Sequence, residues 1–125
     1  RKGLLKILLI DEHIAVREGL QIASKESWGG SVHWAGVRGD AQEEVAAANF
    51  DLVIADCLIQ QEDTLAMLSK SGHRLTFPVF IYTAVENPTY IARALSVSVV
   101  GYLLKSEPIE RMRCACNLSI ILEDR

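Results

Sequence analysis

Four short apolar stretches of this sequence end in polar residues that suit the binding of a metal ion or a phosphate group. These residues are Asp11 with Glu12, Asp56, Thr83 and Lys105. Acidic side chains that converge repel one another, and a hard divalent cation such as Mg²⁺ removes that penalty. A lysine ammonium adds a positive charge, and a threonine hydroxyl adds a short hydrogen-bond donor. A carboxylate nucleophile with these partners is suited to accept a phosphoryl group.

Each of these residues also has an ordinary structural interpretation. Asp11 or His13 can cap the helix that follows, Asp56 can lie in a turn, and Lys105 can be a solvated charge. The feature that favours chemistry is their placement at the ends of four different apolar stretches. If these stretches are parallel strands, their carboxyl ends meet at the edge of the sheet where ligands bind.

The elements that must position these residues alternate between two kinds of segment. Longer polar-apolar stretches carry apolar residues at helical spacing, the last of them over Glu107–Glu123. Between them lie short apolar runs, mostly rich in β-branched or aromatic residues, that predict buried strands. Five strands alternating with five helices predict an α/β fold, a doubly wound sandwich with a parallel sheet covered on both faces. The predicted strands are Leu4–Ile10, Val32–Val37, Asp51–Ala55, Phe77–Thr83 and Val99–Leu104.

The composition is that of one globular domain. The chain has 125 residues, of which 50% are hydrophobic and 23% are charged. Its net charge of −3 argues against a basic nucleic-acid coat or a polybasic membrane binder, and its apolar runs are too short to cross a bilayer. Three cysteines fit no disulfide framework, which favours reduced thiols in a cytoplasmic protein. Because the chain starts with Arg1 instead of Met, we expect it to be part of a longer protein.

Five segments contain the acidic, threonine and lysine positions in a characteristic order and spacing: Leu8–His13, Val16–Leu20, Asp51–Asp56, Ile81–Ala84 and Gly101–Ser106. In these segments the sequence resembles the receiver domain of two-component response regulators, and the resemblance covers essentially the whole chain, residues 1–125. The first two segments and the last are similar to the LuxR/FixJ-type branch in particular. The resemblance implies a flavodoxin-like (βα)5 three-layer sandwich whose five-stranded parallel sheet has the strand order 2-1-3-4-5.

The resemblance implies a phosphorylation-dependent switch rather than an enzyme that turns over an external substrate. Asp56 would accept a phosphoryl group from a sensor histidine kinase or a small phosphodonor. Mg²⁺ would be held by Asp56, Glu12, Asp11 and the backbone carbonyl of Leu58.

The remaining implied roles concern the response to phosphorylation. Lys105 would pair with the phosphoryl group, and Thr83 would move to bind it, drawing Tyr102 inward as an aromatic switch. The surface of the fourth helix, fifth strand and fifth helix would then change. It would control an output domain beyond the chain, expected to be a helix-turn-helix that binds DNA and regulates transcription. A homodimer is a further possible assembly, whereas membrane binding and direct nucleic-acid binding by this domain are not expected.

Two departures from the family pattern keep an alternative open. Gln60 and Thr64 stand where most receivers carry Pro and Gly, so we expect the loop after the third strand to differ in shape or mobility. The chain would then be a pseudo-receiver, an interaction module that is not phosphorylated. A third class, an aspartate-nucleophile phosphatase, expects an acidic residue where this chain has His13. A nucleotide binder expects a glycine-rich loop after the first strand, which is absent.

Overall fold

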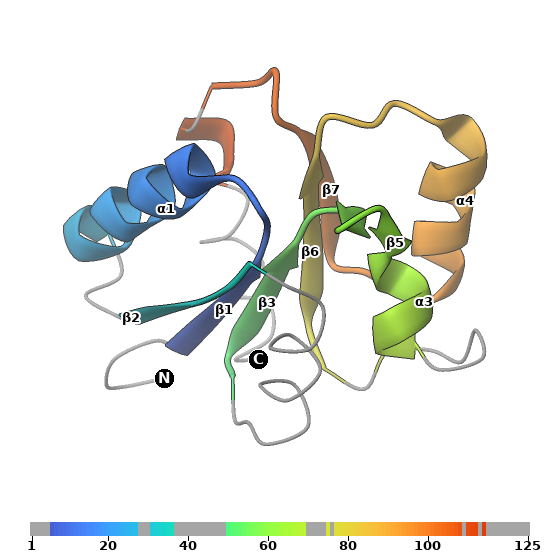
Figure 1. The fold of residues 1–125 in the computed structure, drawn as a ribbon, viewed down its shortest axis with the longest axis horizontal. Helices are drawn as coiled ribbons and strands as arrows, with labels where there is room; N and C mark the ends of the chain where they lie inside the picture. The colour runs from blue at the N-terminus through green and yellow to red at the C-terminus, as the bar shows by residue number, and fades with distance from the viewer. Residues whose placement is uncertain are drawn as a thin grey trace.

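The computed structural model describes residues 6–27, 31–36, 50–69, 75, 77–108, 110–112 and 114 (Figure 1). Its centre is a five-stranded parallel sheet with the strand order β2-β1-β3-β6-β7. Because β6 and β7 are the fourth and fifth strands of this sheet, the predicted order 2-1-3-4-5 is confirmed. The strands are β1 (Lys6–Ile10), β2 (Ser31–Ala35), β3 (Leu52–Ala55), β6 (Val79–Thr83) and β7 (Gly101–Leu104).

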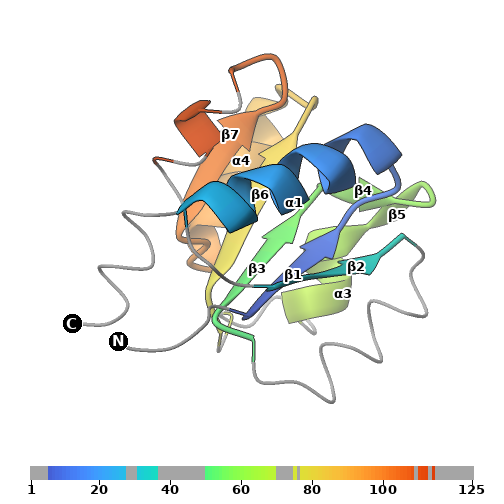
Figure 2. The same cartoon turned by 90° about the vertical axis from the view of Figure 1, so that its left-hand side faces the viewer.

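The strands are apolar almost without interruption because both faces of the sheet are covered. Figure 2 shows α1 (Ile14–Ser27) in front of the sheet, with α3 (Thr64–Ser69) and α4 (Pro88–Ser96) behind it. Alternate residues of each strand point to opposite faces of the sheet, so each strand contributes side chains to two separate hydrophobic cores. The sequence therefore predicts burial on both sides correctly.

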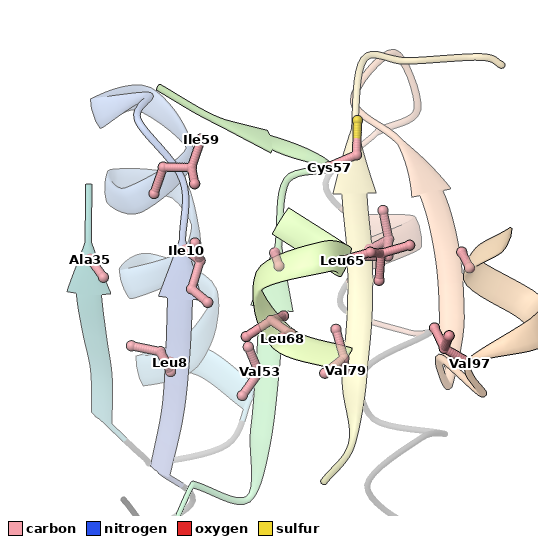
Figure 3. Close-up of a cluster of buried hydrophobic side chains, with 13 residues drawn as sticks. Leu8, Ile10, Ala35, Val53, Cys57, Ile59, Leu65, Leu68, Val79 and Val97 are labelled. Atoms are coloured by element: carbon pink, nitrogen blue, oxygen red, sulfur yellow. The ribbon is translucent and has the colours of Figure 1, made fainter. Parts of the chain in front are cut away.

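The two cores divide the strand residues by this alternation. On the α3 and α4 face, Leu8 and Ile10 of β1 join a cluster with Leu65 and Leu68 of α3 (Figure 3). On the α1 face, Ile7 and Leu9 join Leu20, Phe80, Tyr82 and Met112. The site described below lies at the carboxyl ends of these strands, so the packing of the two cores positions its backbone.

Helices lie between the predicted strands wherever the structure describes those stretches. Asn87 caps α4, because its side-chain oxygen accepts hydrogen bonds from the backbone N–H groups of Thr89 (2.9 Å) and Tyr90 (3.2 Å), and Pro88 occupies the first helical position. The helix predicted between the second and third strands lies outside the described residues. The last helix was predicted from Glu107, but residues 107 and 108 are not helical, whereas residues 110–112 and 114 are. No helix in the described ranges combines the length and apolar character that a membrane span requires.

A short hairpin after β3 was not predicted. Its strands, β4 (Leu58–Ile59) and β5 (Glu62–Asp63), pair in antiparallel register. The two turn residues, Gln60 and Gln61, have φ values of 50° and 63°. Left-handed conformations at both central positions match the twist of a two-residue hairpin, but they normally require Gly or Asn. Strands of two residues also carry no periodic pattern, so the sequence contained neither of the usual signals.

Candidate functional site

The polar residues predicted to carry chemistry meet at one edge of the sheet. Asp11 follows β1, Asp56 follows β3, Thr83 ends β6 and Lys105 follows β7. Backbone hydrogen bonds extend the sheet past the strand ends: Asp56 N–H donates to the Ile10 carbonyl at 2.9 Å, and Lys105 N–H donates to the Thr83 carbonyl at 2.7 Å. The parallel register therefore fixes the backbone from which all four side chains project.

The ammonium of Lys105 lies at the centre of the site. Its Nζ is 2.8 Å from Asp11 Oδ2 and donates to Asp56 Oδ2, also at 2.8 Å. The Asp11 side chain is fully buried, and those of Asp56 and Lys105 are 11% and 14% exposed. Burial by itself lowers the pKa of Lys105, but the hydrogen bonds and charges of the two aspartates raise it above its ordinary value. The lysine therefore stays charged at neutral pH and neutralises the acidic pair.

Thr83 holds the second oxygen of the Asp56 carboxylate. Its buried hydroxyl donates to Asp56 Oδ1 at 2.6 Å and accepts from the Val85 N–H at 3.3 Å. The thiol of Cys57 lies 3.2 Å from the same hydroxyl oxygen. Because the hydroxyl proton is directed at Asp56, the thiol acts as the donor in that contact. Burial is the main cause that raises the pKa of the Cys57 thiol, so it remains neutral.

Glu12 does not join this cluster. Its side chain is exposed, and its carboxylate Oε1 accepts a hydrogen bond from the backbone N–H of Gln60 in the hairpin turn. The contact exists because position 60 is not proline, which has no N–H. The structure thus separates Glu12 from Asp11 and Asp56, although the sequence analysis placed all three in one metal site.

The Leu58 carbonyl is left free of the hairpin ladder. Thr64 N–H donates to the Cys57 carbonyl at 3.0 Å, which makes Cys57 and Thr64 a hydrogen-bonded pair. Since such pairs alternate in an antiparallel ladder, Leu58 and Asp63 form the non-hydrogen-bonded pair. The backbone carbonyl of Leu58 therefore accepts no hydrogen bond from the opposite strand of the hairpin. This is consistent with its predicted role as a metal ligand, which requires an available oxygen.

Tyr102 is half-buried and packs near a second tyrosine. Its hydroxyl donates to the Val85 carbonyl at 2.8 Å, and its ring centroid is 6.3 Å from that of Tyr90. Tyr90 in turn donates to the Cys57 carbonyl at 3.4 Å. Burial is the main cause that raises the pKa of Tyr102 to about 12, so its hydroxyl keeps its proton at physiological pH. The two rings connect α4 and β7 with the loops that follow Asp56 and Thr83.

Sequence reasoning missed the role of the His13 ring. The backbone of His13 does begin α1, because its carbonyl accepts from the N–H groups of Val16 (3.1 Å) and Arg17 (3.3 Å). Its ring, however, reaches the site: Nδ1 is 2.9 Å from Asp11 Oδ1 and 2.9 Å from Lys105 Nζ. The available signal was its position two residues after Asp11 at the end of a buried strand.

The donor set fits a divalent cation. Oxygen atoms of Asp11 and Asp56 and Nδ1 of His13 lie within 4.8 Å of one another. Asp11 Oδ2 is buried, and its charge is paired with the Lys105 ammonium at 2.8 Å. Carboxylate oxygens and an imidazole nitrogen are common ligands of divalent cations. The residues present are therefore compatible with the Mg²⁺ site expected from the sequence.

An α/β sandwich that gathers two aspartates, a threonine and a lysine at its strand ends is the architecture of a signalling receiver. The family model "Response regulator receiver domain" matches residues 7–117, and the chain belongs to this family.

Two curated transcriptional regulators illustrate the relationship in sequence. The chain is 28% identical over 113 residues to the transcriptional regulatory protein ZraR of Salmonella typhimurium, which covers 90% of this chain and 25% of that protein. It is 29% identical over 102 residues to the transcriptional regulatory protein PmrA of Pectobacterium parmentieri, covering 81% of this chain and 46% of that protein. The chain thus spans about a quarter to a half of the length of these relatives.

Solved receiver structures share the fold. The signal receiver domain of a putative Luxo repressor protein from Vibrio parahaemolyticus has a TM-score of 0.82 at 16% identity, covering 98% of this chain and 96% of that one. A LuxR-family DNA-binding response regulator from Staphylococcus aureus has a TM-score of 0.80 at 22% identity, covering 94% and 99%. These TM-scores establish the shared fold. At identities this low they show no more than the fold, so the narrower assignment to the LuxR/FixJ-type branch stays a prediction.

Proposed function

We propose that this receiver domain is a phosphorylation-dependent switch in which Asp56 accepts a phosphoryl group from a sensor histidine kinase or a small phosphodonor. The observation that carries the proposal is the buried Asp56 carboxylate, which receives one hydrogen bond from Thr83 and one from Lys105. In the transfer, a carboxylate oxygen forms a bond to phosphorus while the bond from phosphorus to the donor atom breaks. The leaving group departs with that electron pair.

The residues around Asp56 supply positioning and positive charge. Asp11, Asp56 and the free carbonyl of Leu58 would hold Mg²⁺, with Glu12 joining them once it leaves Gln60. When bound, Mg²⁺ supplies charge that neutralises the phosphoryl oxygens. The Lys105 ammonium lies 2.8 Å from Asp56 and would pair with the transferred group.

The response to phosphorylation would begin at Thr83. Its hydroxyl now donates to the carboxylate that phosphorylation would consume, so the phosphoryl oxygens become its natural acceptors. A shift of Thr83 would disturb Val85, whose N–H and carbonyl contact Thr83 and Tyr102. We propose that this chain of contacts moves Tyr102 and alters the surface of α4, β7 and the last helix.

The output of this switch is proposed from the relatives. ZraR and PmrA are described as transcriptional regulatory proteins and extend beyond the matched region. We propose that residues 1–125 control an output domain outside this chain, a DNA-binding helix-turn-helix, in the cytoplasm. The receiver would then catalyse its own phosphorylation and dephosphorylation and act on no other substrate. A phosphorylation-dependent homodimer is compatible with this scheme.

One observation favours a second candidate, the pseudo-receiver. The backbone N–H of Gln60 donates a hydrogen bond to the Glu12 carboxylate. Proline, the usual residue at this position, has no N–H and would prevent this contact. If that contact persists when Mg²⁺ is offered, the metal site lacks one ligand and phosphorylation fails. The domain would then act as a protein-interaction module.

Mass spectrometry after incubation with acetyl phosphate and Mg²⁺ separates the two candidates. The switch requires a gain of one phosphoryl group that disappears in Asp56→Ala. Asp51→Asn is a matched control, because Asp51 precedes β3 at the opposite end and accepts a hydrogen bond from the Lys6 N–H. The absence of an adduct in the unaltered chain, or an adduct that survives Asp56→Ala, would favour the interaction module.

A further inference from the structure

The position of His13 is set by its backbone. Its N–H donates to Asp11 Oδ1 at 2.8 Å, and its carbonyl accepts the first hydrogen bonds of α1. The residue is thereby held between the end of β1 and the start of α1. Its side chain is 65% exposed, so the ring lies at the rim of the site, where a solvated ion enters.

The ring nitrogen faces three charged groups at once. Nδ1 is 2.9 Å from Asp11 Oδ1, 2.9 Å from Lys105 Nζ and 3.9 Å from Asp56 Oδ2. A single ring nitrogen cannot both donate a proton to Asp11 and accept one from Lys105. When it accepts from Lys105, its lone pair and the oxygens of both aspartates are all directed at one cation.

The Lys105 ammonium marks the point on which these atoms converge. Asp11 Oδ2 and Asp56 Oδ2 are 2.8 Å from Nζ, and His13 Nδ1 is 2.9 Å from it. Metal–ligand bonds to oxygen and nitrogen are about 2.0–2.2 Å long. A metal that displaces the ammonium from this point therefore requires each donor atom to move inward by less than about 1 Å. The fully buried Asp11 Oδ2 is therefore an oxygen that already faces a cation in this structure, the Lys105 ammonium.

We infer that the His13 imidazole is an additional protein ligand of the cation, beside the oxygen ligands of the proposed site. The inference deepens the proposed function, on which it rests for the identity of the site. An imidazole nitrogen adds little for Mg²⁺, which prefers oxygen ligands and retains its water. It favours first-row transition cations, which bind imidazole more readily. The site therefore discriminates between divalent cations, and the discrimination depends on His13.

Mn²⁺ is the probe for this inference. Electron paramagnetic resonance of the free ion gives its affinity, competition gives that of Mg²⁺, and electron spin-echo modulation detects a directly bound ¹⁴N nucleus. We expect ¹⁴N modulation in the unaltered chain and its loss in His13→Asn. Loss of the ligand lowers Mn²⁺ affinity by at least about tenfold, the size of effect seen even for outer-shell partners of metal sites. Mg²⁺ affinity falls less, so the Mn²⁺/Mg²⁺ affinity ratio decreases.

The matched control is His33→Asn. His33 is an exposed histidine of β2 whose ring packs against Phe50 at 5.5 Å. This variant must keep both the ¹⁴N modulation and the affinity ratio. Circular dichroism melting of both variants establishes that they fold.

Each outcome decides the inference. Absent ¹⁴N modulation in the unaltered chain, or an unchanged affinity ratio in His13→Asn, overturns it. Phosphorylation of the unaltered chain by acetyl phosphate with Mg²⁺, measured separately, reports on the proposed function. A phosphorylated chain without ¹⁴N modulation refutes the ligand role alone, whereas ¹⁴N modulation without phosphorylation supports the ligand role and refutes the switch.

Discussion

The strand-end pocket and the β4–β5 hairpin beside it are held in place by different means. In the pocket, Asp11, Asp56, Thr83 and Lys105 project from buried strands whose register fixes their spacing. The hairpin has strands of two residues and two left-handed glutamines. Side chains from elsewhere hold it: Glu12 contacts its turn, and Arg93 of α4 pairs with Asp63. The chemical groups therefore depend on the sheet, whereas the loop over them depends on long-range contacts.

Removing the central cation should affect the pocket most. Lys105→Met leaves the Asp11 and Asp56 carboxylates close together without their counter-charge. Because removing one partner of a buried ion pair leaves an uncompensated charge, we expect a loss of about 3 kcal/mol in the free energy of unfolding at pH 7. Urea denaturation in EDTA measures this loss, and added Mg²⁺ should recover part of it.

Lys25→Met, on the exposed side of α1, is the control for charge removal. A loss of below about 1 kcal/mol for Lys105→Met, as for an exposed pair, would show that the pocket is not organised around the ammonium.

Restoring the family's usual proline tests the hairpin. Proline requires φ near −65° and has no N–H, whereas Gln60 has φ 50° and donates to Glu12. We expect Gln60→Pro to disrupt the turn at a cost of about 2 kcal/mol, since strained or broken local structures carry penalties of this order. The freed Glu12 should raise Mg²⁺ affinity.

Tryptophan fluorescence in a Trp28→Phe background measures that affinity, because the Trp34 indole N–H donates to the Asp11 carbonyl at 2.7 Å. Gln60→Gly is the control that keeps the N–H and tolerates positive φ, so its Mg²⁺ affinity should stay the same. Equal Mg²⁺ affinities in the proline and glycine variants would show that the contact between Gln60 and Glu12 does not affect metal binding.

Alkaline pH should weaken the region around the tyrosines. Burial raises the folded-state pKa of Tyr102 to about 12, against about 10 in an unfolded chain. The folded state therefore holds this proton more tightly. The contribution of Tyr102 to the free energy of unfolding is fully present below about pH 10 and is lost as the pH rises toward about 12. At pH 11 the loss is roughly 1 kcal/mol.

Urea denaturation between pH 8 and about pH 11.5 measures the free energy of unfolding across the range in which Tyr102 would lose its proton. Tyr102→Phe should lose stability less steeply than the unaltered chain over this interval. Parallel slopes would mean that other groups, such as Tyr90 and Lys105, whose pKa values are also raised, account for the whole effect.

The smallest effect is expected at the second turn residue. Gln61 has φ 63°, a conformation that glycine adopts without steric penalty. We expect Gln61→Gly to stabilise the chain by up to about 1 kcal/mol, as relief of left-handed strain predicts. Thermal unfolding measures it. Gln21→Gly, within α1, should have the opposite sign and destabilise by about 1 kcal/mol.

The fold could be predicted because the relevant signals are local and repeated. The apolar runs around Leu8 and Val53 identify strands that are covered on both faces, and their alternation with helices leaves few topologies. The pocket followed from the same pattern, since parallel strands bring their carboxyl ends to one edge. Thr64 shows where local reasoning was misleading: at the usual glycine position it begins α3, and the positive φ values fall at Gln60 and Gln61.

The sequence by itself determined the alternation of strands and helices and which polar residues close the strands, because both follow from apolar periodicity and chain order. The order of the strands within the sheet was implied by the family resemblance. The tertiary structure decided what these residues contact. Glu12 turns to the hairpin, the His13 ring turns to the site, and Lys105 lies between two aspartates. These outcomes depend on distances between residues up to 92 positions apart in the chain, which only the packed sheet defines.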